Sequence, residues 1–133
     1  MTNAVQAVIA KQLTLRAIPV LSSVGQVDHL LIPGPGGDLL VRVYTPKGDG
    51  PFPVLVYFHG GGWVIGTLDT YDASCRALTD EAACVVVSVA YRLAPEHPFP
   101  AAAEDAYAAY EWVLTHAAAI NGDPQRIAVG GES

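Results

Sequence analysis

One stretch of the sequence limits the possible folds more than any other. The apolar residues 54–58 are followed directly by His59 and by three glycines at residues 60–62. A short continuous apolar run bounded by glycines is typical of a strand that is buried on both faces. The glycines predict a loop whose backbone approaches another group closely, because side chains at these positions would keep that group away.

Strands and helices alternate downstream of this run. The apolar strands are continuous rather than alternating, which indicates burial on both faces. We expect strands over residues 54–58, 84–90 and 126–129, and helices over residues 70–83 and 101–119. This order predicts an α/β fold with a mostly parallel sheet and helices on both of its faces.

The helix over residues 101–119 has the clearest pattern, because its apolar residues recur every three or four positions. Pro100 suits the first turn, and Glu104 and Asp105 favour the positive end of the helix rather than forming a catalytic acid/base pair. Asn121 and the glycine after it are typical of a helix end.

The segment before residue 54 has a different pattern of apolar residues. Residues 27–32 and 39–44 are short strand-like runs, and the Pro/Gly-rich residues 33–38 between them predict a turn. Strands joined by so short a loop are antiparallel. Residues 4–17 predict an amphipathic helix, either a lid over a site or the first core helix. We therefore divide the chain into a lid-like region, 1–26, and the first strands and helices of a core, 27–133.

Composition excludes several classes of function. The net charge is −6 and there is no basic run, which argues against a nucleic-acid partner or an anionic membrane surface. The N-terminus does not resemble a signal peptide, and no apolar run is long enough to span a bilayer, so we expect a cytoplasmic protein. Cys75 and Cys84 are expected to be free thiols, and we expect no metal site and no cofactor. The sequence leaves the oligomeric state open.

The glycine-rich loop has a chemical interpretation. In acyl transfer the carbonyl oxygen becomes negative in the transition state, and converging backbone N–H groups stabilise it. A glycine run directly after a buried strand provides such groups, as in the oxyanion loops of lipases and esterases. The alternatives are a plain turn or a phosphate-binding loop, but neither Gly-x-Gly-x-x-Gly nor Gly-Lys-Ser/Thr occurs here.

Ser133 closes the segment Gly130-Gly131-Glu132-Ser133, which matches the first part of a Gly-x-Ser-x-Gly nucleophile elbow. A bare Gly-x-Ser is often a plain turn. Its position after the third expected parallel strand, downstream of the glycine-rich loop, favours a nucleophile.

These motifs together resemble the hormone-sensitive-lipase family of α/β-hydrolases, from about Leu31 to Ser133. The matching stretches are residues 32–37, 41–46, 59–63 (His-Gly-Gly-Gly-Trp), 91–97 (Tyr-Arg-Leu-Ala-Pro-Glu-His), 99–105 and 126–133. Two positions depart from the family pattern: Ala90 stands where Asp is usual, and Glu132 stands where Asp is commoner. The resemblance implies an eight-stranded sheet and a serine carboxylesterase that acts on small, short-chain acyl esters through an acyl-serine intermediate.

The resemblance also implies roles for individual residues. Ser133 would be the nucleophile, and Gly61 and Gly62 would supply oxyanion N–H groups. His59, with Gly60, would support the loop rather than act as the base. In this fold the chain order is Ser, then Asp or Glu, then His, so both partners would follow Ser133.

The remaining histidines, His29, His97 and His116, are therefore not expected to act as the base. The chain would then be part of a longer esterase, and the 133 residues alone are expected to be inactive and poorly stable. An amidase or formamidase of the same fold remains an alternative. A second alternative is a non-catalytic binding module similar to the plant gibberellin receptor.

Overall fold

The computed structural model describes residues 24–133, and the helix predicted over residues 4–17 lies outside them. The elements in chain order are β1 (Gln26–Gly34), β2 (Gly37–Thr45), β3 (Phe52–Phe58), α2 (Asp72–Ala82), β4 (Val85–Val89), α3 (Ala101–His116), the 3₁₀ helix η1 (Ala117–Ile120) and β5 (Gly122–Gly131). The predicted order of strands and helices is confirmed.

The strands form one five-stranded sheet in the order β1-β2-β4-β3-β5. The β1–β2 and β2–β4 pairs are antiparallel, while β3 is parallel to both β4 and β5. The α/β class and the antiparallel first pair are thus confirmed. Within residues 24–133 the sheet is mixed, and parallel pairing is confined to β3, β4 and β5.

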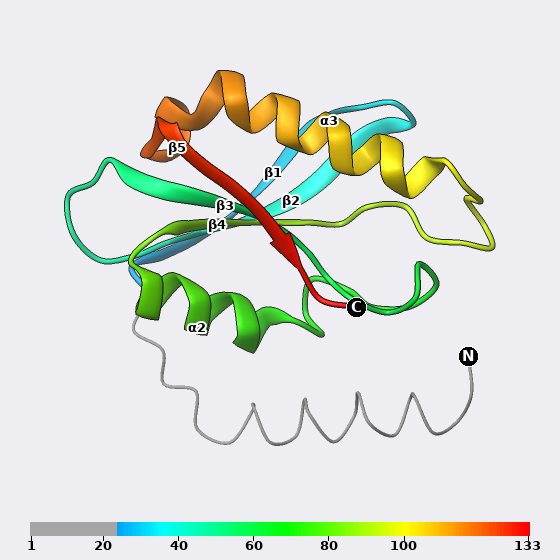
Figure 1. The fold of residues 1–133 in the computed structure, drawn as a ribbon, viewed down its shortest axis with the longest axis horizontal. Coiled ribbons are helices and arrows are strands. Elements are labelled where there is room, and N and C mark those ends of the chain that lie inside the picture. The colour runs from blue at the N-terminus through cyan, green and yellow to red at the C-terminus, as the bar shows by residue number, and fades with distance from the viewer. Residues whose placement is uncertain (1–23) are drawn as a thin grey trace.

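The two helices cover opposite faces of the sheet, α2 on one side and α3 on the other (Figure 1). Successive side chains of a strand point to opposite faces, so a strand between two helix layers is apolar at every position. In β4, Val85, Val87 and Val89 belong to the core that contains residues of α3. Val86 belongs to the second core, which contains Cys75 of α2.

Several boundaries differ from the prediction. The first two strands are longer because they pair continuously from Gln26–Thr45 to Gly34–Gly37. The helix predicted to run to residue 119 ends as an α-helix at His116 and tightens into η1. The predicted cap is confirmed, because Asn121 adopts a left-handed conformation after η1. The last strand begins at Gly122, four residues before the predicted start at residue 126.

Asp105 has a different role from the one its position in the helix suggested. It is buried, with an exposed fraction of only 2%. Its carboxylate accepts hydrogen bonds from the backbone N–H, Nε and a terminal nitrogen of Arg92, at 2.9–3.0 Å. Asp105 therefore anchors the segment that follows β4 onto α3, in addition to lying near the positive end of the helix.

Candidate active site

The glycine-rich loop begins where β3 ends and has an unusual backbone. Gly61, Gly62 and Trp63 all have positive φ angles, 134°, 64° and 70°. The Gly61 carbonyl accepts hydrogen bonds from the N–H groups of Val64 and Ile65, at 3.2 and 3.1 Å. A Cβ at Gly61 would lie 1.9 Å from the Ile65 carbonyl oxygen. This turn therefore requires glycine at residue 61.

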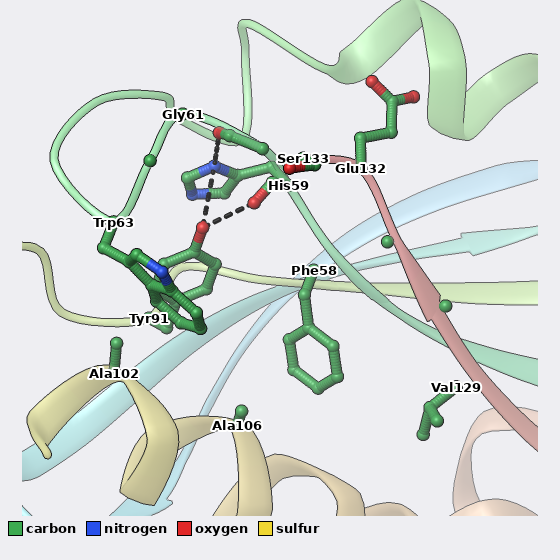
Figure 2. A pocket seen from close by; sticks show the side chains of 14 residues that line it. Phe58, His59, Gly61, Trp63, Tyr91, Ala102, Ala106, Val129, Glu132 and Ser133 are labelled. Carbon is green, nitrogen blue, oxygen red and sulfur yellow. Dashed lines mark hydrogen bonds between the residues drawn. The ribbon is translucent and has the colours of Figure 1, made fainter. Parts of the chain in front are cut away.

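His59 holds the base of the loop. Its side chain is buried, and its Nδ1 lies 2.8 Å from the Gly60 carbonyl oxygen, a contact in which Nδ1–H is the donor. The ring stacks on Tyr91 at a centroid distance of 4.4 Å (Figure 2) and on Tyr71 at 5.5 Å. Burial lowers the pKa of His59 and outweighs the hydrogen bond to Gly60, which favours the protonated form. The imidazole is therefore neutral at neutral pH.

Tyr91, which follows β4, braces the loop from another side. Its hydroxyl donates to the His59 carbonyl oxygen, and its ring meets Trp63 edge to face at a centroid distance of 6.1 Å (Figure 2). Burial raises the pKa of Tyr91 to about 12, so the hydroxyl remains a donor. Farther along, the Ala94 N–H donates to the Trp63 carbonyl oxygen at 2.8 Å. Tyr91 belongs to a recognised family stretch, but no sequence pattern indicated this bracing role.

Strand pairing brings Ser133 to the same loop. The register of β3 and β5 places Phe58 beside Gly131, and the Glu132 N–H donates to the Phe58 carbonyl oxygen at 3.2 Å. A Cβ at Gly60 would lie 3.1 Å from the Ser133 carbonyl carbon. A Cβ at Gly131 would lie 2.5 Å from the Phe58 carbonyl oxygen. Glycine at both positions lets the two backbones come together.

The loop and Ser133 line one cavity of about 430 Å³. Part of its wall is apolar and comes from β3, α3 and β5 (Figure 2). These apolar residues are Phe58, Ala102, Ala106 and Val129. The structure thus brings together all the residues that the sequence singled out: His59, Gly60, Gly61, Gly62 and Ser133.

The other three histidines have different surroundings. His29 accepts a hydrogen bond from Arg42 Nε at 2.9 Å, and the His116 ring stacks on Trp112 at a centroid distance of 4.5 Å. The backbone N–H of His97 donates to the Leu93 carbonyl oxygen. Of the four histidines, His59 is the one that lines the cavity.

The cysteines do not take part in the site. Cys75 and Cys84 are both buried and both free, as predicted. Burial raises the pKa of both thiols, which keeps them protonated and unreactive.

A fold with parallel central strands, a glycine-rich loop after β3 and a serine after β5 defines a class of hydrolases. A family model described as "alpha/beta hydrolase fold" matches residues 55–133. The chain belongs to this family.

Named relatives carry the resemblance further. The chain is 55% identical to the carboxylic ester hydrolase LipN of Mycobacterium tuberculosis, over 80% of this chain and 29% of LipN. It is 46% identical to the esterase LipI of the same organism, over 98% of this chain and 42% of LipI. A hyperthermophilic esterase from the archaeon Pyrobaculum calidifontis superposes with a TM-score of 0.87 at 42% identity, over 98% of this chain and 43% of that one.

The chain therefore spans less than half the length of these relatives. Within residues 24–133, no helix is both long enough and apolar enough to cross a membrane.

Proposed function

We propose that the protein containing this chain is a serine carboxylesterase that hydrolyses short-chain acyl esters, with Ser133 as nucleophile. The observation that carries the proposal is the contact between the loop and the serine. The loop packs so closely against the backbone of Glu132 and Ser133 that a Cβ at Gly60 would lie only 3.1 Å from both residues, closer than most Cβ contacts. Named esterases among the relatives support the same chemistry.

The reaction has two halves. Ser133 Oγ attacks the ester carbonyl carbon and transfers its proton to a general base, and the carbonyl oxygen becomes an oxyanion. The N–H groups of Gly61 and Gly62 stabilise this oxyanion. The oxyanion collapses, the ester C–O bond breaks, and the base returns its proton to the leaving oxygen, which departs as the alcohol. Water then attacks the acyl-serine in the same way and releases the acid and free Ser133.

The base and its acidic partner belong to the part of the protein after Ser133, in the chain order of this fold. His59 is a poor candidate for the base, because its Nδ1 is committed to Gly60 and its ring lies between two tyrosines. We assign His59, with Gly60, to holding the loop.

The cavity, the net charge and the cysteines also bear on the substrate and the location of the protein. A small ester suits a cavity of about 430 Å³, and the net charge of −6 argues against nucleic acid. We propose a cytoplasmic location, in keeping with two free, buried cysteines.

The test uses the complete native gene product with p-nitrophenyl acetate and p-nitrophenyl butyrate. We expect turnover in the native protein and its loss in Ser133→Ala, together with loss of covalent labelling by an alkyl phosphonate. Thr115→Ala, which removes an exposed hydroxyl on α3, is the control and should retain both. Equal turnover in native protein and Ser133→Ala would refute the proposal.

A further inference from the structure

A charged network lies beside the glycine-rich loop, on the side of β1, β2 and α2. Its centre is Arg42 of β2, whose side chain is only 12% exposed. Its guanidinium donates to the Tyr44 hydroxyl of the same strand at 3.5 Å and to three acceptors from other parts of the chain. These are His29 Nε2 at 2.9 Å, Asp69 Oδ1 at 2.6 Å and Asp72 Oδ1 at 3.1 Å. A lysine could not span them, because only arginine has a planar fork of donors.

Asp72 is held from two further directions. Its Oδ1 accepts the Tyr44 hydroxyl at 2.6 Å, and its Oδ2 accepts Arg76 Nε at 2.8 Å. Burial raises the pKa of Asp72, but the hydrogen bonds from Tyr44 and Arg76 and the charges of Arg76 and Arg42 outweigh burial, so the pKa lies below its usual value. The carboxylate is therefore ionised and fixed at the first residue of α2.

The two aspartates flank, in sequence, the tyrosine that supports His59. Tyr71 lies between Asp69 and Asp72, and its buried ring stacks on His59 at a centroid distance of 5.5 Å. The same ring meets Tyr57 at 6.4 Å. Because Arg42 binds the chain on both sides of Tyr71, it fixes the ring that lies behind His59.

We propose that Arg42 is a positioning residue for the oxyanion loop. Through Asp69 and Asp72 it holds Tyr71 against His59, and His59 in turn sets the direction of the Gly61 and Gly62 N–H groups. Arg42 touches no reacting atom. This inference rests on the proposed function, and it predicts that Arg42 affects the chemical step more than substrate binding. Misplacing a catalytic group by about 1 Å can cost about 100-fold in rate.

The first test compares two substitutions in the complete native gene product. Arg42→Gln removes the charge and the fork, and Asp69→Asn removes the charge from a carboxylate that is 87% exposed. Exposed ion pairs contribute little to stability, so Asp69→Asn should fold normally. The matched control is Arg126→Gln, which breaks an Arg–Asp pair of the same kind on β5.

For esters we expect kcat to fall about 10- to 100-fold in Arg42→Gln and severalfold in Asp69→Asn. KM should stay within about twofold, because binding before the chemical step does not use the oxyanion donors. The rate of phosphonate labelling should fall in parallel with kcat. Arg126→Gln should leave all three quantities unchanged.

A double-mutant cycle separates positioning from general destabilisation. If Arg42 acts through Tyr71, Arg42→Gln should lower kcat much less in a Tyr71→Leu background than in the native protein. Losses that multiply independently would contradict the proposal.

A readout that does not depend on turnover keeps the two proposals separate. The protein is labelled with 5-fluorotryptophan, and the Trp63 resonance is assigned from its absence in Trp63→Phe. The resonance should shift in Arg42→Gln and Asp69→Asn but not in Arg126→Gln, whether or not the native protein hydrolyses esters. Unchanged kcat and an unchanged Trp63 resonance would overturn the inference. If Arg42→Gln fails to fold, the same two measurements on Asp69→Asn test the inference. Absence of turnover in the native protein would instead refute the proposed function.

Discussion

Gly61 and Gly62 are neighbours in sequence with different steric surroundings. A Cβ at Gly61 would lie 1.9 Å from the Ile65 carbonyl oxygen, whereas a Cβ at Gly62 would meet nothing within 4 Å. Gly62 still has a φ of 64°, a left-handed conformation that costs another residue about 1–2 kcal/mol. The same substitution therefore has different physical costs at the two sites.

We predict that Gly61→Ala lowers the free energy of unfolding by more than about 3 kcal/mol. Gly62→Ala should lower it by only about 1 kcal/mol, because it adds backbone strain without a clash. Urea unfolding of the two variants measures both values. Equal losses would show that the Gly61 turn can relax around a methyl group.

His59 predicts a dependence of stability on pH. Its pKa is lowered in the folded protein, so between that pKa and the ordinary value of about 6.5 the unfolded chain binds more protons than the folded chain. His59 therefore contributes stability that is fully present above pH 6.5 and is lost as the pH falls through its folded pKa.

NMR titration should find the His59 imidazole still neutral at pH 6.5. The free energy of unfolding should decline below that pH, and less steeply in His59→Gln. An imidazole that titrates at or above its ordinary pKa would contradict the burial argument.

At the scale of elements, β4 is buried on both faces. Val87 has no exposed surface and belongs to the core that contains residues of α3. Val87→Ala should lower the free energy of unfolding by about 2–3 kcal/mol, through lost burial and the cavity left behind. Val129→Ala is the control: its side chain is 56% exposed, so denaturant unfolding should find a loss below about 1 kcal/mol. Similar losses at both positions would contradict the predicted difference in packing.

The Arg92–Asp105 ion pair should contribute more to stability than the Arg126–Asp123 ion pair. Asp105 is buried, whereas the Arg126–Asp123 pair is more exposed, and a buried carboxylate depends more on its partners. Asp105→Asn should therefore lower the denaturant midpoint, and Asp123→Asn should lower it much less. The reverse order would mean that α3 does not depend on its contact with the segment after β4.

The core elements could be predicted well because β3 and β4 lie between two helix layers. Their side chains are buried on both faces of the sheet, so apolar residues follow one another in the sequence. The ends of elements were predicted less well, since the early end of α3 and the extension of β5 depend on packing and on strand pairing. The glycines could be predicted because crowded backbone demands a residue without a side chain. Ser133 was singled out by its motif and its place after the last strand, and its role as nucleophile stays a prediction. The sequence did not indicate that Arg42 and Tyr91 support the loop, because their hydrogen-bond partners lie far away in sequence.

For the molecule as a whole, the described sheet ends at β5, which pairs with β3 on one side. An exposed strand edge with an apolar side chain such as Val129 favours pairing with another chain. We predict that residues 1–133, expressed alone, self-associate at micromolar concentration. Val129→Lys should reduce this association, as measured by sedimentation velocity, whereas Gln125→Lys, also on β5, should reduce it less. A monomeric, stable 1–133 would contradict the prediction.

The pairing of β5 with β3 also has a consequence for when the site can exist. The glycine-rich loop follows β3, but its partner Ser133 follows β5, and α2, β4 and α3 all lie between them in sequence. Closing so long a connection is slow compared with forming either helix. During synthesis, residues 59–63 can pack against Tyr71 and Tyr91 before Ser133 is made, and the loop meets the serine once β5 has docked. The loop and Ser133 therefore come together late, after the helices and strands between them have been made.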